Sequence, residues 1–215
     1  MRGLWAAQRR DRAVNAGHGP FQAEQMNNKN IAAPLASALA GRGYATLTSV
    51  QQAVLEPEAR GRDLLVSAQT GSGKTVAFGI AAAPDLLTEG GALPAAQTPL
   101  ALAIAPTREL ALQVAAELTW LYAATGARIA TCVGGMDYRT ERRALERGAH
   151  IVVGTPGRLR DHIERGGLDL SALRVAVLDE ADEMLDLGFR EDLEFILQAA
   201  PESRRTLMFS ATVPP

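Results

Sequence analysis

A glycine-rich loop that carries one lysine is the first stretch of this sequence with residues suited to a specific chemistry. It reads Ala68-Gln-Thr-Gly-Ser-Gly-Lys-Thr75 and joins a short apolar run to an amphipathic segment. Gly71 and Gly73 let backbone N–H groups turn around an anion, where a Cβ atom would obstruct the turn. A helix that begins near Lys74 adds the positive end of its dipole. The loop predicts a phosphate-binding site, against the alternative of a glycine-rich turn before a helix.

The polar residues of this loop suit different parts of a nucleotide bound with Mg²⁺. Lys74 is expected to reach the β and γ phosphates, and the Thr75 hydroxyl to ligate the metal. Ala68 stands where the strict pattern has glycine, so the match departs at one position. The predicted nucleotide-binding residues of the loop are Thr70, Gly71, Ser72, Gly73, Lys74 and Thr75.

A group of acids follows another apolar run further along the chain. Val175-Ala-Val-Leu178 leads directly into Asp179, Glu180 and, after one alanine, Asp182. Asp179 is the candidate second ligand of Mg²⁺, directly or through water. Glu180 is expected to point elsewhere and to accept a proton from the water that attacks the γ-phosphate. A helix N-terminus enriched in acids is the alternative, and the phosphate loop upstream favours the metal site.

Short apolar runs alternate with amphipathic segments, and these elements must position the loop and the acids. Most runs are continuous rather than alternating, as is typical of strands buried on both faces of a parallel sheet. The order predicts an α/β fold with a doubly wound, mostly parallel sheet. The predicted strands are 63–68, 100–106, 128–134, 150–156, 175–180 and 206–212. The predicted helices are 33–41, 48–59, 74–88, 107–125, 137–147, 157–165 and 189–199.

Every unusual block of the sequence follows a predicted strand. An open parallel sheet binds its ligand at the carboxyl ends of its strands, so these blocks are expected to share one edge. Besides the loop and the acids, the blocks are Pro106-Thr-Arg108, Gly134-Gly135, Thr155-Pro-Gly-Arg158 and Ser210-Ala-Thr212.

Bulk properties fit one soluble domain. The chain has 215 residues, 47% of them hydrophobic, and a net charge of −2 that decides nothing about nucleic acid. Residues 1–28 are polar and aperiodic and predict a mobile tail, and residues 29–215 predict one domain. The single cysteine, Cys132, predicts a buried apolar side chain in a reducing compartment. The three scattered histidines predict no metal cluster, and no segment predicts a signal peptide or membrane span, so the cytoplasm is the expected location.

Taken together, these blocks resemble the N-terminal RecA-like domain of a DEAD-box ATP-dependent RNA helicase. Residues 179–182 read Asp-Glu-Ala-Asp. Together with this block, six blocks occur in the family's order over residues about 31–215. The resemblance implies ATP and Mg²⁺ as cofactors, RNA as a partner, and Lys74, Asp179 and Glu180 as catalytic residues. It also implies that Ser210 and Thr212 link ATP hydrolysis to strand separation through hydrogen bonds to Asp182.

The resemblance extends to an adenine-reading element at Gly43-Tyr44 and Thr48-Ser-Val-Gln51. A side-chain amide offers both a donor and an acceptor to the adenine edge, so Gln51 would select ATP over GTP. Leu47 stands where the family has proline. The aromatic residue expected before Gly43 has no equivalent at the usual spacing, since Phe21 lies further upstream.

The resemblance assigns the remaining blocks to the RNA sugar–phosphate backbone. Arginines can hold phosphates through two parallel hydrogen bonds. Contacts of this kind carry no base information, so binding would be independent of sequence and sensitive to salt. The alternative for Arg108 and Arg158 is a surface ion pair, with Glu109 or Asp161. The predicted RNA-binding residues are Pro106, Thr107, Arg108, Gly134, Gly135, Thr155, Gly157 and Arg158.

Family members have a second RecA-like domain that closes over ATP and supplies arginine fingers, and this sequence does not contain it. We therefore expect the chain alone to bind nucleotide weakly and to hydrolyse it slowly or undetectably. Two other functions stay open: a P-loop motor that acts on DNA or protein, and a non-catalytic RNA-binding scaffold. Gln51 and the acidic block disfavour the motor on DNA or protein. The non-catalytic scaffold is disfavoured by intact Lys74, Thr75, Asp179 and Glu180.

Overall fold

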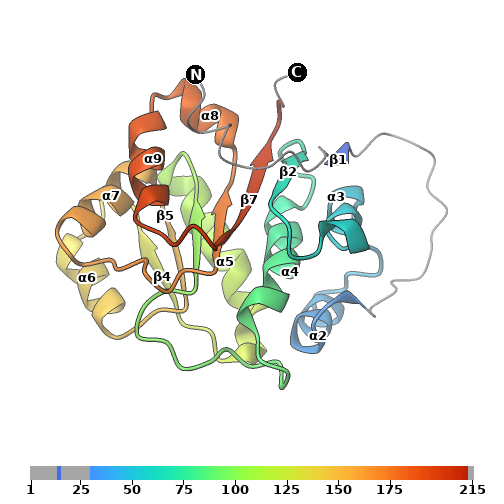
Figure 1. Cartoon of the computed structure of the whole chain (residues 1–215). Coiled ribbons are helices and arrows are strands. Elements are labelled where there is room, and N and C mark those ends of the chain that lie inside the picture. The colour runs from blue at the N-terminus through green and yellow to red at the C-terminus, as the bar shows by residue number, and fades with distance from the viewer. Residues whose placement is uncertain (1–13, 16–29, 213–215) are drawn as a thin grey trace.

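One parallel sheet organises the chain in a computed structural model that describes residues 14–15 and 30–212. Its strand order is β1-β2-β7-β6-β3-β5-β4, and every pair is parallel (Figure 1). The predicted α/β fold with a doubly wound parallel sheet is confirmed. The strands are β1 Val14–Asn15, β2 Leu64–Ser67, β3 Ala101–Ile104, β4 Ile129–Cys132, β5 Ile151–Gly154, β6 Val175–Leu178 and β7 Arg205–Ser210.

All six predicted strands form, and each is shorter than its apolar run because the ends of the runs already belong to loops. Strand β1 is additional. It falls inside the predicted tail, where Val14 pairs with Val66 and Asn15 with Ser67. Two residues are too few to give a periodic pattern. The rest of that predicted tail lies outside the described residues.

Helices cover both faces of the sheet, as the alternation of runs predicts. Apart from shifts at helix ends, two features differ from prediction. The expected helix 48–59 divides before Pro57, since a residue before proline is biased away from the helical region. The six-residue helix α8 is absent from the predictions because it is too short to show a period. The helices are α2 Ala33–Gly41, α3 Ser49–Ala53, α4 Lys74–Leu86, α5 Arg108–Leu121, α6 Tyr138–Glu146, α7 Pro156–Glu164, α8 Ala181–Asp186 and α9 Arg190–Gln198, with short 3₁₀ turns at Pro57–Ala59 and Ala123–Thr125.

Two apolar cores result, one on each face of the sheet. Alternate residues of a strand point to opposite faces, so Ala101 and Ala103 face one core and Leu102 and Ile104 the other. Helices α2 to α5 complete the first core, and helices α6 to α9 complete the second. Figure 1 shows α2 and α3 at the right of the sheet and α6, α7 and α9 at the left. Burial on both faces explains why the strands read as continuous apolar runs.

A buried arginine at the start of β7 ties the sheet to segments far away in sequence. Arg205 donates hydrogen bonds to the carbonyl oxygens of Ala59 (2.7 Å), Arg62 (2.6 Å) and Ala81 (2.7 Å). Its Nη1 also contacts Asp85 Oδ2 at 2.9 Å. One guanidinium thereby joins β7, helix α4 and the turn before β2.

Among the described helices, none combines the length and the apolarity that crossing a membrane requires.

Candidate nucleotide and RNA site

The glycine-rich loop turns sharply at two positions that favour glycine. Gly71 and Gly73 both have φ of +82°, the left-handed region that residues with a Cβ atom rarely adopt. A Cβ atom at Gly73 would lie 2.4 Å from Gln51 Nε2. Helix α4 begins at the next residue, Lys74, so its free N–H groups face the loop. The local geometry is that of an anion cradle at a helix N-terminus.

The phosphate loop and the acidic block meet at the lysine. Lys74 Nζ lies 3.3 Å from Glu180 Oε1 and 3.5 Å from Asp179 Oδ1. Thr70 Oγ1, at the start of the loop, donates to the same Glu180 oxygen at 3.2 Å. Strands β2 and β6, which precede the two blocks, flank β7 in the sheet. Residues 106 positions apart are thereby brought into direct contact.

The expectation that Glu180 points away from Asp179 is wrong, because both carboxylates contact Lys74. Glu180 has φ 53° and ψ 53°, and among the described residues it alone combines a side chain with positive φ. Left-handed backbone at a residue with a Cβ costs roughly 1–2 kcal/mol. The turn lets two successive carboxylates face one side, at the point where strand β6 passes into helix α8.

The surroundings of Glu180 favour its ionised form. A hydrogen bond with Glu183 is the largest influence on it, and together with the ammonium group of Lys74 it keeps the pKa of Glu180 below its usual value. The same hydrogen bond raises the pKa of Glu183. Glu180 is therefore a carboxylate at neutral pH and can accept a proton.

The residues predicted to hold Mg²⁺ fit such an ion. Asp179 is buried at the end of β6, and its Oδ1 has no hydrogen bond of normal geometry among the described residues. A buried carboxylate oxygen without a donor is costly, and a cation or its water shell would satisfy it. Thr75 is also buried, next to Lys74 in the first turn of α4. Thr75 and Asp179 are the residues that would hold the ion.

Two aspartates of the acidic block should affect stability in opposite directions. Burial raises the pKa of Asp179, so its ionisation at neutral pH disfavours the folded state. For Asp182, burial raises the pKa, but hydrogen bonds from Thr212 outweigh it and the net pKa is lowered. At neutral pH, Asp179→Asn should therefore raise Tm and Asp182→Asn should lower Tm. The check is thermal unfolding without nucleotide or Mg²⁺.

The pH dependence of these two differences distinguishes charge from packing. The benefit of neutral Asp179 is present below the unfolded pKa and is lost as the pH rises through the folded value. The benefit of ionised Asp182 is present above the unfolded pKa and is lost as the pH falls through the folded value. Both differences from wild type should therefore shrink in acid. A lower Tm for Asp179→Asn at neutral pH would contradict the account.

The predicted adenine-reading residue is joined to the phosphate loop. Gln51 is buried; its Oε1 accepts the N–H of Thr48 at 3.0 Å, and its Nε2 donates to Gly73 O at 3.2 Å. Thr48 Oγ1 donates to Ser72 O at 2.8 Å. An amide has two donors and two acceptor positions, so one of each stays free for a base. Phe21, the upstream aromatic, lies outside the described residues.

The blocks assigned to RNA lie on the other half of the same sheet edge. They follow β3, β4 and β5, which are neighbours in the sheet, whereas the nucleotide blocks follow β2, β6 and β7. Thr107 caps helix α5 by accepting the N–H of Leu110 at 3.2 Å. Arg108 packs on Gly135, where an added Cβ atom would lie 2.7 Å from Arg108 Nη1, and its Nη2 contacts Met136 Sδ. Among the described residues, Gly134 and Gly157 have open space where a Cβ would be.

Arg158 forms ion pairs and a hydrogen bond with other residues of the chain. Its Nε lies 3.0 Å from Glu141 Oε2, its Nη1 lies 3.8 Å from Asp161 Oδ2, and its Nη2 donates to Met136 O. The alternative of an ion pair with Asp161 is therefore present in the structure. The partner at Glu141 was not predicted, because it lies on a different helix and sequence spacing does not show it.

The block at the end of β7 contacts the acidic block directly. Thr212 donates to Asp182 Oδ2 from its backbone N–H at 3.0 Å and from its hydroxyl at 2.8 Å. Ser210 Oγ donates to Thr212 O at 2.6 Å. A hydrogen-bonded path thus runs from the end of β7 to the first turn of helix α8.

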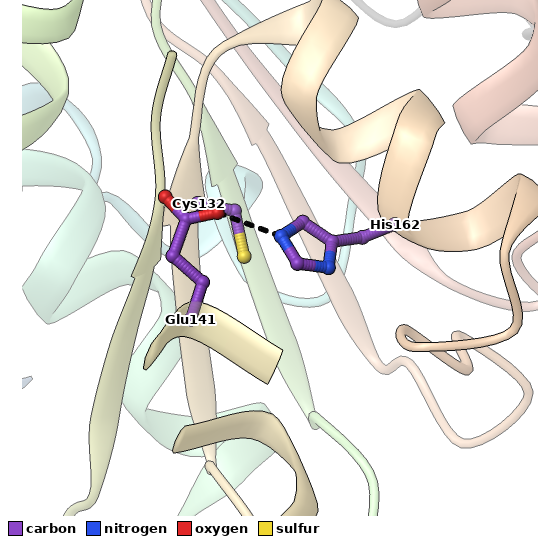
Figure 2. A group of neighbouring side chains, drawn as sticks. All are labelled: Cys132, Glu141 and His162. Carbon is purple, nitrogen blue, oxygen red and sulfur yellow. Dashed lines mark hydrogen bonds and ion pairs between the residues drawn. The ribbon is translucent and has the colours of Figure 1, made fainter. Parts of the chain in front are cut away.

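Cys132 is buried as predicted, and it lies in a cluster that the sequence did not predict. Burial raises the pKa of the Cys132 thiol to about 12, so it is a neutral apolar group. His162, which had no predicted partner, lies with Glu141 and Cys132 in one buried cluster (Figure 2). The three residues come from β4, α6 and α7, so spacing along the chain gave no sign of the cluster.

Comparison with known proteins agrees with this geometry. Residues 48–215 match the sequence profile of the DEAD/DEAH box helicases. The chain belongs to that family. It is 42% identical over 190 residues to the DEAD-box ATP-dependent RNA helicase CshA of Streptococcus pneumoniae, covering 88% of this chain and 35% of that protein. It is 46% identical over 185 residues to the ATP-dependent RNA helicase DeaD of Escherichia coli, covering 86% of this chain and 28% of that protein.

A solved DEAD-box structure shares the fold. The crystal structure of a DEAD box protein from the hyperthermophile Methanococcus jannaschii superposes with a TM-score of 0.77 at 37% identity. The match covers 88% of this chain and 50% of that protein. The chain thus spans about a third of the curated DEAD-box relatives and half of this structural relative.

Proposed function

We propose that this chain is the ATP-binding half of an RNA helicase motor. It binds Mg·ATP through the phosphate loop, Gln51 and the acidic block, and it binds the RNA sugar–phosphate backbone beyond β3, β4 and β5. A second RecA-like domain of the parent protein would complete both clefts. The observation that carries the proposal is the convergence of Lys74 with Asp179 and Glu180.

Each residue of the nucleotide half has a distinct task in this proposal. Mg²⁺, when bound, would neutralise charge on the β and γ phosphates. Lys74 would exchange its contacts with the two carboxylates for phosphate oxygens. Glu180, a carboxylate at neutral pH, would take the proton of the attacking water. Asp182 would couple nucleotide binding to the end of β7 through the hydrogen bonds that it accepts from Thr212.

The printed names of the relatives describe ATP-dependent RNA helicases, and two further observations support extending that activity to this chain. Gln51 keeps one donor and one acceptor free beside the phosphate loop, which suits adenine. The second half of the sheet edge carries Arg108 and two open glycines, which suits a phosphate backbone without base readout. The single cysteine, buried and neutral, is consistent with the cytoplasm as the working compartment.

The test is a set of binding measurements on the 215-residue chain. We expect Mg·ATP to bind about tenfold more tightly than Mg·GTP, a difference of about 1.4 kcal/mol, because only adenine matches the amide of Gln51. A single-stranded RNA should bind more tightly than DNA of the same sequence, with an affinity that falls as salt rises. Isothermal titration gives the first ratio, and fluorescence anisotropy gives the second. The Gln52→Ala variant is the control for the ATP preference. It should keep that preference, since Gln52 donates to Leu47 O, away from the phosphate loop.

Three results would change the assignment. Equal affinity for ATP and GTP would remove the role of Gln51. Tighter binding of DNA than of RNA would favour the DNA motor. RNA binding together with undetectable Mg·ATP binding would favour the non-catalytic scaffold.

A further inference from the structure

Glu141 is a buried acid outside every block assigned to nucleotide or RNA. It lies on helix α6, is 4% exposed, and reaches the sheet between β4 and helix α7 (Figure 2). A buried carboxylate is costly unless charged or polar partners surround it. Its partners therefore indicate what it does.

Both oxygens of Glu141 are engaged, and each is directed to a different partner. Oε1 accepts the N–H of Val133 at 2.8 Å. Oε2 lies 2.7 Å from His162 Nε2 and 3.0 Å from Arg158 Nε. An imidazole N–H at Nε2 can donate to this carboxylate oxygen. One side chain thus links strand β4, helix α6 and helix α7.

These contacts fix the turn between β4 and α6 at both ends. Val133 is the residue before Gly134, so the bond to Oε1 fixes the entry of the turn. At the exit, Arg158 Nη2 donates to Met136 O, and its Nε forms an ion pair with Glu141 Oε2 at 3.0 Å that lacks hydrogen-bond geometry. Gly134 and Gly135 lie between these two anchors. The carboxylate therefore sets the position of the proposed RNA-contacting glycines without touching RNA itself.

The aromatic surroundings hold the same arrangement in place. Tyr138 stacks on His162 with ring centroids 4.3 Å apart and an interplanar angle of 9°. Arg158 and Arg165 lie over the Tyr138 ring, at 5.5 and 5.0 Å from its centroid. The stacked rings restrict the rotamers from which His162 and Arg158 reach Glu141.

Glu141, His162 and Cys132 also have the separation of metal ligands, but their chemistry disfavours a cation. Both carboxylate oxygens already have partners, and the Arg158 guanidinium beside them would repel a metal ion. The cluster serves hydrogen bonding.

We propose that Glu141 is a positioning residue for RNA, which holds the Gly134–Gly135 turn and Arg158 in register across the ends of β4 and β5. This inference rests on the proposed RNA-binding function. It also changes the role of Arg158, which acts mainly as the strut between Glu141 and Met136 and only secondarily as a phosphate contact.

The test replaces Glu141 with glutamine. The amide oxygen of Glu141→Gln can still accept from Val133, whereas its NH₂ group faces the donors of Arg158 and His162 and releases the strut. We expect the Kd for a short fluorescein-labelled oligouridylate to rise about tenfold, and the Kd for Mg·ATP to stay within about twofold. The slope of log affinity against log salt should not change, since no phosphate contact is lost. Loss of a direct phosphate contact would reduce that slope by about 0.7.

A second signal reports on the strut without RNA. The NMR resonance of the Arg158 Nε–H should shift in Glu141→Gln, because the group 3.0 Å from Nε loses its charge. The matched control is Glu146→Gln, which removes the same charge from an exposed site of the same helix, where Glu146 pairs with Arg142 at 2.9 Å. If Glu141→Gln fails to fold, Arg158→Lys tests the same strut, because one ammonium group cannot hold both Glu141 and Met136.

The outcomes separate this inference from the proposed function. If wild type binds no RNA, the RNA half of the proposed function fails and the role of Glu141 fails with it. If wild type binds RNA and Glu141→Gln binds equally well, only the positioning role is overturned. Tighter binding by Glu141→Gln would also overturn it, since it would mean that Glu141 withholds Arg158 from RNA.

Discussion

Replacing Arg205 with alanine should lower the free energy of unfolding by about 3–5 kcal/mol, because several acceptors inside the fold lose their donor. Its guanidinium is 7% exposed and donates to three backbone carbonyls and to Asp85. Without it, those carbonyls lose their donor inside the fold, and a buried acceptor left without a donor costs about 1–3 kcal/mol. Lysine would not restore the contacts, because one ammonium group cannot span acceptors on three segments.

Urea denaturation of the 215-residue chain measures this effect, and thermal unfolding should show a Tm lower by about 2–4 °C for each kcal/mol. Arg174→Ala is the matched control. Arg174 is exposed and donates at 3.3 Å to the backbone oxygen of the same Asp85. We expect the control to stay within about 0.5 kcal/mol of wild type. Equal losses of unfolding free energy in the two variants would show that water satisfies the partners of Arg205 as well as its guanidinium does.

Lys74→Ala should raise the Kd for Mg·ATP at least about 100-fold, a loss of about 2.7 kcal/mol or more. The substitution removes the ammonium group that lies within 3.5 Å of both carboxylates. Asp179 would then be buried beside Glu180 without a counter-charge, which disfavours a second anion such as a triphosphate. Isothermal titration with Mg·ATP checks the loss.

Binding of RNA in the absence of nucleotide separates this effect from misfolding. The RNA half of the site follows different strands, so the Lys74→Ala variant should keep the RNA affinity of wild type within about twofold. Asp179→Asn provides a comparison that keeps the lysine and removes only one carboxylate. Unchanged Mg·ATP affinity in Lys74→Ala would contradict the motor function and favour the non-catalytic RNA-binding scaffold.

The strands and the nucleotide half were predictable because their signals are local. A buried parallel strand reads as a continuous apolar run, and the phosphate loop and the acidic block each follow such a run. Since all strands of a parallel sheet present their carboxyl ends at one edge, the meeting of Lys74 with Asp179 followed from the topology.

The features that sequence missed depend on backbone angles and distant contacts. The left-handed conformation of Glu180 is imposed by its surroundings, and a residue with a Cβ gives no sign of it. Glu141 reads as one acid in a mixed-charge helix, and only the fold places it against Val133, Arg158 and His162. Helix α8 is too short to show a period, and strand β1 even more so.

The position of β7 has a consequence for the order of assembly. This strand lies between β2 and β6, yet it is the last of the three to leave the ribosome. Until residues 205–210 are made, no strand pairing joins the two strands that precede the phosphate loop and the acidic block. Pairing across such a large sequence separation is slow, and unpaired strand edges meanwhile stay exposed. The nascent chain therefore already contains every predicted nucleotide ligand before it contains the strand that assembles them into one site.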